Sequence, residues 1–302
     1  MVSKHNNRYI SIRPISKLKF FFWSDPFRLP RNNEILSKLK EKEIQFVVAL
    51  GKHTLNDKSY NRIQPLIEKS IGANICILDK DFAHLDNSYR FIELYQILRK
   101  SKSFRYIKEI YIDAEISNKI RNLPIQKKIT YIFDRYPKEK EIKKAIANYN
   151  HLADLIHKDG KKFGIIRSIP SIYEFEKLTR NVPYEEIKSD ITVFMTYRIP
   201  QGREKEFSDI WFYRVTKKEG DNIFLGDIKD GYRSLKKDIS ICSYLKKKRV
   251  YIYDYYGFQK FCKLGDLEPN KYKLRQNRWE SLKHISKFSS MEIVDKILRL
   301  FK

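Results

Sequence analysis

Residues 106–115 read Tyr-Ile-Lys-Glu-Ile-Tyr-Ile-Asp-Ala-Glu, the pattern of a buried strand that ends in two acidic side chains. Side chains alternate across a strand, so Asp113 and Glu115 share one face with Tyr111. Two acids at the end of a buried strand are unfavourable unless they bind or react with something. We therefore take Asp113 and Glu115 as the first candidates for a functional site.

Similar apolar, β-branched and aromatic runs recur along the chain, with helical patterns between them. The predicted strands cover residues 19–23, 45–50, 74–78, 107–114, 162–167, 191–197, 222–226 and 249–255. The predicted helices cover residues 32–43, 60–70, 87–100, 138–159, 171–179, 204–218, 234–248 and 278–301. Eight strand–helix units in this order predict an α/β fold, a (β/α)8 TIM barrel.

The predicted barrel is a single domain over residues 1–302, with a long loop at 116–137 and a carboxyl-terminal helical segment at 276–302. Long loops at the carboxyl ends of barrel strands are where substrate grooves are built. An open doubly wound sheet is the alternative fold. The turn after the first strand, Ser24-Asp25-Pro26-Phe27, lacks the glycines that such a sheet uses to bind a nucleotide.

The chain carries 62 Lys and Arg against 37 Asp and Glu, a formal net charge of +25. This surplus is compatible with nucleic acid, an anionic surface or an acidic polysaccharide as partner, and equally with a solvated lysine-rich surface. The three cysteines are widely spaced and the six histidines form no ligand motif, so we expect no metal and no cofactor.

No apolar run is long enough to span a bilayer, so we expect no transmembrane segment. The sequence leaves the cellular compartment of the protein open. Removal of a signal sequence ahead of this chain would make it extracellular or periplasmic, and otherwise it would be cytoplasmic.

The sixth predicted strand gives a second motif, Met195-Thr196-Tyr197-Arg198, with Tyr197 at the strand end. Together the two strands resemble family 18 of the glycoside hydrolases, the chitinases and their relatives. Those barrels carry D-x-x-D-x-D-x-E at strand four and M-x-Y-D at strand six. Residues 108–115 keep the last Asp and Glu of the first motif, and Arg198 replaces the last Asp of the second.

The resemblance implies a retaining, substrate-assisted hydrolase of polysaccharides that contain N-acetylhexosamine, such as chitin, peptidoglycan or an exopolysaccharide. Glu115 would be the acid, Asp113 would stabilise the N-acetyl group, and Tyr197 would bind its oxygen. Tyr111 stands where the family has a further Asp. Candidate substrate-binding residues at this and other strand ends are Trp23, Asp25, Asp79, Tyr111, Met195, Arg198, Asp227, Asp254 and Tyr255.

Three alternatives remain open. The lysozyme-like muramidases of family 25 also end a strand with D-x-E. The barrel could instead be a non-catalytic carbohydrate-binding protein, since Lys108 and Tyr111 replace two acids of the family motif. A basic nucleic-acid-binding protein is the third alternative, with the run 246–249 as its most basic segment. Trp211 and Phe212 lie on a predicted helix, and we expect them in the core.

Overall fold

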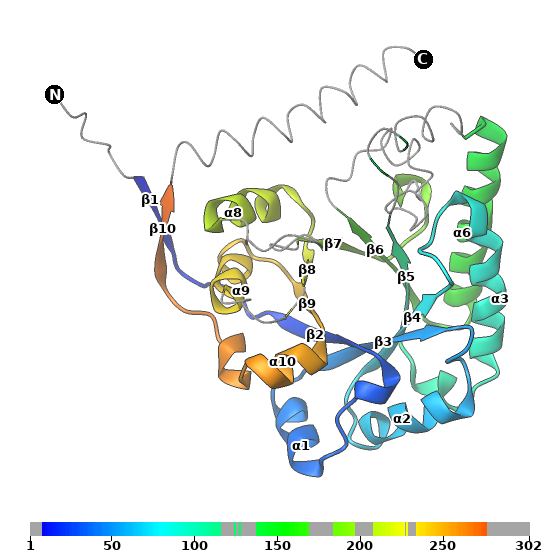
Figure 1. The fold of residues 1–302 in the computed structure, drawn as a ribbon, viewed down its shortest axis with the longest axis horizontal. Helices are drawn as coiled ribbons and strands as arrows, with labels where there is room; N and C mark the ends of the chain where they lie inside the picture. The colour runs from blue at the N-terminus through cyan, green and yellow to red at the C-terminus, as the bar shows by residue number, and fades with distance from the viewer. Residues whose placement is uncertain are drawn as a thin grey trace.

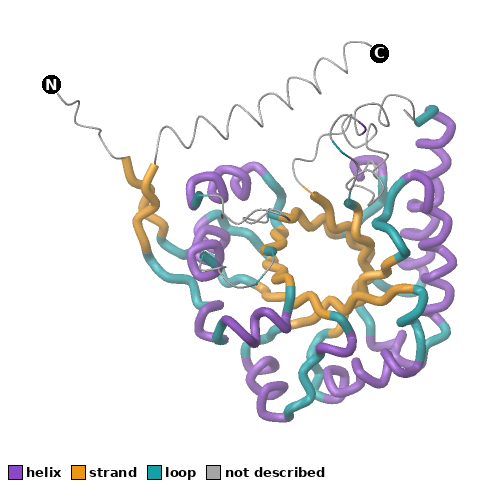
Figure 2. The backbone as a smooth tube through the Cα atoms, viewed as in Figure 1, coloured by secondary structure: helices purple, strands orange, loops and turns teal. Residues whose placement is uncertain are grey.

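The computed structural model describes residues 8–115, 124, 127, 137–168, 184–196, 208–226, 228 and 234–276. Eight parallel strands form a closed barrel with helices around it, which confirms the predicted (β/α)8 fold (Figures 1 and 2). The barrel strands are β2 (Lys19–Ser24), β3 (Gln45–Gly51), β4 (Ala73–Leu78), β5 (Glu109–Ala114), β6 (Lys162–Ser168), β7 (Ile191–Met195), β8 (Asn222–Leu225) and β9 (Arg249–Tyr253).

Each described helix of the outer ring follows a barrel strand. They are α1 (Asn33–Glu41), α2 (Asp57–Glu68), α3 (Ser88–Arg99), α6 (Glu139–Lys158), α8 (Asp209–Lys218), α9 (Leu235–Tyr244) and α10 (Tyr255–Phe261). Short 3-10 helices lie at Pro26–Arg28, Leu85–Asn87, Lys102–Tyr106, Tyr184–Glu186 and Leu264–Leu267. Polar residues fix several starts: the Asn32, Asn56 and Ser208 side chains accept backbone N–H groups in the first turns of α1, α2 and α8.

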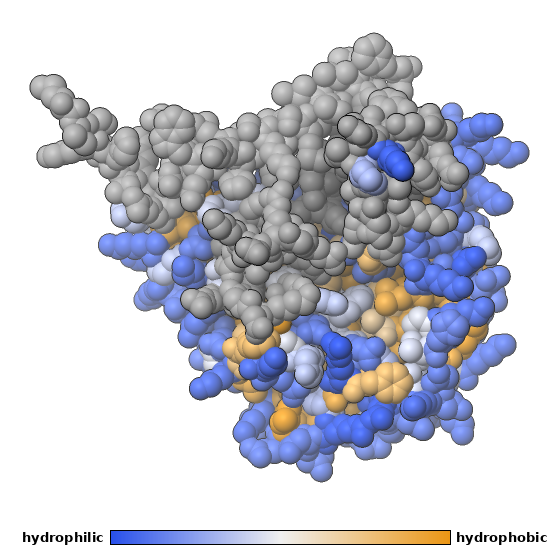
Figure 3. All heavy atoms as spheres, viewed as in Figure 1, coloured by the Kyte–Doolittle hydropathy of each residue, from blue (hydrophilic) through white to orange (hydrophobic). Residues whose placement is uncertain are grey.

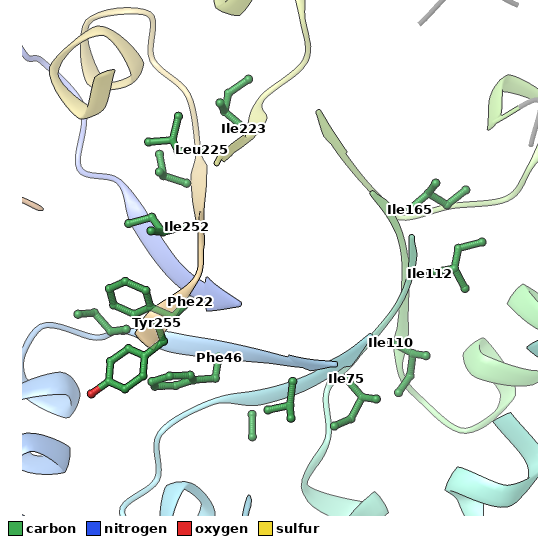
Figure 4. Packing of buried hydrophobic residues seen from close by; sticks show 14 of the residues in the cluster. Phe22, Phe46, Ile75, Ile110, Ile112, Ile165, Ile223, Leu225, Ile252 and Tyr255 are labelled. Atoms are coloured by element: carbon green, nitrogen blue, oxygen red, sulfur yellow. The ribbon is translucent and has the colours of Figure 1, made fainter. Parts of the chain in front are cut away.

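Strand alternation divides the core into two layers. Side chains on the outer face of the barrel, such as Phe22, Phe46, Ile75, Ile110 and Ile252, pack under the helices (Figure 4). Side chains on the inner face fill the barrel: Phe21, Trp23, Val47, Cys76, Tyr111, Ile166, Ile191, Val193, Met195, Phe224 and Tyr251. The predicted core residues Trp211 and Phe212 are both buried in the outer layer. The interior is thus filled with side chains, as in other TIM barrels.

A buried polar network lies in the lower part of the barrel, toward the amino ends of β5 and β9. The Arg249 Nη1 atom donates to Glu109 Oε1 at 2.9 Å and to Oε2 at 3.0 Å. Tyr111 donates its hydroxyl to Glu109 and lies 2.9 Å, oxygen to oxygen, from the Tyr251 hydroxyl. Burial and the nearby Glu109 carboxylate raise the pKa of Tyr111, and burial raises the pKa of Tyr251 to about 12. Both phenols beside the Glu109–Arg249 ion pair are therefore neutral. This network closes the barrel floor.

Gly164 makes room for the Tyr111 ring. It lies opposite Tyr111 in the β5–β6 register, and a Cβ at position 164 would stand 2.3 Å from Tyr111 Cδ1. Any side chain there would overlap the ring, so glycine is required by close approach.

One sheet lies outside the barrel and was not predicted. β1 (Arg8–Ile12) pairs antiparallel with β10 (Tyr272–Gln276), from Arg8 opposite Gln276 to Ile12 opposite Tyr272. α9 packs against β1 and α8 against β10, on the left of Figure 1. The ribbon therefore joins the two ends of the described chain. Most of the predicted carboxyl-terminal helical segment, everything after Gln276, lies outside the described residues. The helix predicted at 171–179 also lies outside them.

Candidate functional site

The two acidic residues lie at the carboxyl end of β5, the end of the barrel where TIM-barrel active sites form. Tyr111 belongs to the inner layer and Ala114 to the outer one, so Asp113 faces the interior by alternation. Asp113 is 8% exposed, and its charge contributes, after burial, to the raised pKa of Cys76 on β4. Glu115 follows β5 directly and is partly buried. Both residues interact with neighbouring groups.

The loop between β4 and α3 is hydrogen-bonded to the backbone of Asp113. The Ala83 N–H donates to the Asp113 carbonyl oxygen at 2.7 Å. Ala83 belongs to the segment between β4 and α3, where buried His84 Nδ1 accepts the Asp86 N–H at 3.2 Å and Nε2 lies 3.6 Å from Asp81 Oδ2. With Nδ1 accepting, the proton of a neutral His84 sits on Nε2, toward Asp81. This histidine could not be predicted from the sequence, because a single His in a loop belongs to no recognisable motif.

Three aromatic side chains lie across the barrel from β5: Trp23 and Phe224, which are buried, and Tyr253, which is exposed at the mouth. Trp23 ends the inner face of β2, and its ring lies 5.7 Å from that of Phe224 on β8. The Phe224 ring in turn lies 6.3 Å from that of Tyr253, the last residue of β9, which is 36% exposed. β8, β9 and β2 are consecutive in the closed barrel, and β5 lies across from them. The mouth therefore has one acidic and one aromatic wall.

Tyr253 was missed in the sequence, although strand alternation could have found it. The predicted strand ran to residue 255, whereas β9 ends at Tyr253 and α10 begins at Tyr255. Arg249, Tyr251 and Tyr253 share a face, so the correct strand end points to Tyr253. The neighbouring candidate Met195 is buried among the inner-layer residues.

Two predicted substrate-binding residues lie away from the mouth, and we leave both out of the site. Tyr255 is 1% exposed in the outer layer, with its ring 5.3 Å from that of Phe22 and 5.1 Å from that of Phe46 (Figure 4). Tyr111 is fully buried, and its hydroxyl is bound at the barrel floor. Their burial leaves no surface for a substrate.

Three predicted acids lie on the rim and bind protein groups. Asp25 accepts the Phe27 N–H at 2.8 Å, and Asp254 accepts the Gly257 N–H at 2.8 Å, so both act as helix caps. Asp79 Oδ2 lies 3.4 Å from Arg90 Nη1. Three further predicted site residues, Tyr197, Arg198 and Asp227, lie outside the described residues.

The basic run 246–249 contributes mainly to the fold. The Lys247 Nζ atom donates to the Glu219 and Gly220 carbonyls at 2.6 and 3.0 Å, and burial lowers its pKa. Arg249 belongs to the barrel floor. These two cations are therefore not available as a nucleic-acid surface.

Within the described ranges, no group of three or more His, Cys, Asp or Glu side chains is arranged to hold a metal ion. No helix among the same residues is both long and apolar enough to cross a membrane.

Comparisons with known proteins give no family for this chain. No family model and no curated protein matches it. Several solved structures are similar in outline. A fusion protein of a xylose isomerase-like TIM barrel and 4-hydroxyphenylpyruvate dioxygenase has a TM-score of 0.40 and 10% identity, over 80% of this chain and 39% of that one. This chain thus spans about two fifths of that protein.

Two other solved structures are similar to this chain. A sugar phosphate isomerase/epimerase from Parabacteroides distasonis has a TM-score of 0.39 and 9% identity, over 75% of this chain and 91% of that one. A protein from Chromobacterium violaceum, described as spore coat polysaccharide biosynthesis protein E, has a TM-score of 0.31 and 9% identity, over 78% of this chain and 65% of that one.

These findings correct the sequence-based assignment to family 18 of the glycoside hydrolases. No family model and no curated protein supports that assignment. The resemblance rested on two short motifs, and D-x-E after a strand arises readily by chance. The class of protein that the fold defines is a (β/α)8 TIM barrel.

Proposed function

We propose that the barrel mouth binds a glycan containing N-acetylhexosamine and cleaves its glycosidic bond, with Glu115 as the general acid. The observation that carries the proposal is the pair of walls at the mouth. Asp113 lies on β5 and Glu115 directly after it, and Trp23 and Tyr253 lie across the barrel on β2 and β9. Aromatic faces pack against the apolar faces of sugars, while carboxylates bind hydroxyls and transfer protons.

The position of both carboxylates on one strand favours a particular mechanism. Side chains two residues apart on a strand are about 6–7 Å apart along it and approach a substrate from the same side. The usual glycosidase mechanism needs two carboxyl groups that flank the bond. A nucleophile carried by the substrate, the carbonyl oxygen of an N-acetyl group, removes that requirement.

In the proposed reaction this carbonyl oxygen attacks the anomeric carbon as the glycosidic C–O bond breaks. The leaving oxygen takes the proton of Glu115, and Asp113 stabilises the charge that develops on the acetamido group. Tyr197 is proposed to hydrogen-bond the same acetamido oxygen. Water then attacks the anomeric carbon while the bond from that carbon to the acetamido oxygen breaks. The water gives a proton to Glu115, and the sugar is released with its configuration retained.

The test is product release from oligomers of N-acetylglucosamine and from peptidoglycan strands. Glu115→Gln should lower turnover about 10²–10⁴-fold, because it removes the transferable proton and keeps the shape of the side chain. Glu93→Gln, at an exposed position on α3, is the matched control and should behave as the parent.

Equal product from Glu115→Gln and the parent protein would refute the catalytic role. Glycan binding without turnover by either protein would refute the enzyme proposal and leave a carbohydrate-binding barrel. Loss of binding in Trp23→Ala or Tyr253→Ala, with folding intact by circular dichroism, would locate that binding at the aromatic wall.

A further inference from the structure

A group of exposed or partly exposed aromatic and cationic side chains lies on the barrel rim beside the aromatic wall. We call Phe27, Arg28, Lys58, Arg62 and Tyr256 the cationic rim. Phe27 and Arg28 belong to the turn after β2, Lys58 and Arg62 to the first turns of α2, and Tyr256 to α10. All three segments follow the carboxyl ends of their strands. They therefore lie at the end of the barrel that carries Asp113 and Glu115.

Each exposed ring of the cationic rim is paired with cations. Lys58 Nζ and Arg62 Cζ each lie 5.6 Å from the centre of the Phe27 ring, and Arg28 Cζ lies 5.0 Å from that of Tyr256. Phe27 is 43% exposed and Tyr256 is 52% exposed. Three cations and two rings thus share one solvent-facing surface, where apolar side chains alternate with hydrophilic ones over α1, α2 and α10 (Figure 3).

The cationic rim is continuous in sequence with the aromatic wall of the mouth. Trp23 ends the inner face of β2 just before the turn that carries Phe27, and Tyr253 ends β9 just before Tyr256. A chain that leaves the mouth along this wall meets the rim next. The rim would then contact sugar units beyond the one at Glu115.

We propose that the cationic rim binds the carboxylate-bearing units of an acidic glycan whose N-acetylhexosamine unit occupies the mouth. This inference rests on the proposed function for the class of polymer. The three cations match carboxylates, and the two rings match sugar faces. The formal charge of +25 draws polyanions of any kind toward the protein.

Carboxylates in the same region favour a glycan over a nucleic acid. Asp254 Oδ2 lies 3.3 Å from Arg28 Nη1, and exposed Asp25 caps the turn that carries Phe27. Asp113 and Glu115 add further acids at the mouth. A nucleic acid carries a phosphate at every unit, so its negative charges would be repelled by these carboxylates along the whole strand. A glycan with alternating charged and neutral units can place its hydroxyls next to the same carboxylates.

The experiment measures binding in the Glu115→Gln background, so that turnover does not enter the result. Two probes of equal length are compared by calorimetry: a hexamer of N-acetylglucosamine, and a hyaluronan hexamer that alternates N-acetylglucosamine with glucuronate. Arg28→Gln with Arg62→Gln should weaken hyaluronan binding by about tenfold, because each lost ion pair at the surface contributes a factor of up to about five. Binding of the neutral hexamer should change less than about twofold, as expected away from charged contacts.

Lys140→Gln with Lys144→Gln is the matched control, since both lysines are exposed on α6 and removal of two charges there lowers the net charge equally. The proposal is overturned if the control weakens hyaluronan binding as much as the rim variant, or if both hexamers bind alike. It is also overturned if single-stranded oligothymidylate binds the rim more tightly than hyaluronan does. Rim-dependent hyaluronan binding without any turnover by the parent protein would refute the proposed function and support the rim.

Discussion

The contact between Gly164 and Tyr111 gives a sharp test of how the barrel interior is packed. Gly164→Ala would put a Cβ 2.3 and 2.4 Å from Tyr111 Cδ1 and Cε1, about 1 Å inside ordinary van der Waals contact. The ring cannot move aside easily, because Tyr111 is fully buried and its hydroxyl is bound to Glu109 and Tyr251.

Overpacking of a core by one methyl group destabilises a protein by about 1–3 kcal/mol, and a weakened hydrogen bond to a charged group adds about 1.5–3 kcal/mol. We expect Gly164→Ala to lower the free energy of unfolding by about 3 kcal/mol. At about 2–4 °C per kcal/mol for a large domain, Tm falls by about 6–12 °C.

A double-mutant cycle with Tyr111→Leu isolates the clash, measured by urea unfolding and thermal melts followed by circular dichroism. Tyr111→Leu removes the ring, so Gly164→Ala should then change stability by less than about 1 kcal/mol. Gly265→Ala, where a Cβ meets nothing within 4 Å, is the control and should be nearly neutral. An equal loss from Gly164→Ala in both backgrounds would refute the packing argument.

Two further predictions concern charges. Glu109→Gln leaves the partly buried Arg249 without its anion and should lower the free energy of unfolding by about 2–3 kcal/mol, less than for a fully buried pair. Glu109→Gln with Arg249→Met should recover much of this loss. Urea titration checks both variants, and an undiminished loss in the double variant would contradict the ion-pair argument. Burial raises the pKa of Glu219 against the lowering effect of Arg167, Lys247 and Lys218. The folded protein thus binds this proton more tightly than the unfolded chain, and the resulting stabilisation is present below the unfolded pKa and lost as pH rises through the folded pKa. The Tm of Glu219→Gln minus the Tm of the parent should therefore increase as pH rises from about 4 to about 8. Thermal melts across this pH range check the prediction. A Tm difference that stays constant with pH would show that Glu219 does not titrate in this way.

The sequence predicted the barrel because strand–helix alternation is a periodic property of many residues. All eight barrel strands occur where the apolar runs predicted them. The inward position of Asp113 also followed, because alternation across β5 needs only the correct strand.

The ends of helices and strands were harder to predict. An aromatic run such as Tyr251–Tyr256 is compatible with a strand and with a helix, so it does not show where one ends and the other begins. Helix α10 begins at Tyr255 because Asp254 caps it. The strand therefore ends at Tyr253, and Tyr253 replaces the predicted Tyr255 as the aromatic residue at the mouth. The cationic rim was not predicted, because it joins three segments that are distant in the sequence and adjacent only after the barrel closes.

The ribbon of β1 and β10 also determines when this fold can be completed during synthesis. Arg8 finds its partner only after Gln276 has left the ribosome, so β1 must wait while all eight barrel strands are made. Pairing across nearly the whole described chain is a slow, late event compared with local helix formation. β1 therefore has no pairing partner until residues 272–276 have been made, and the ribbon cannot form before the barrel strands have been synthesised.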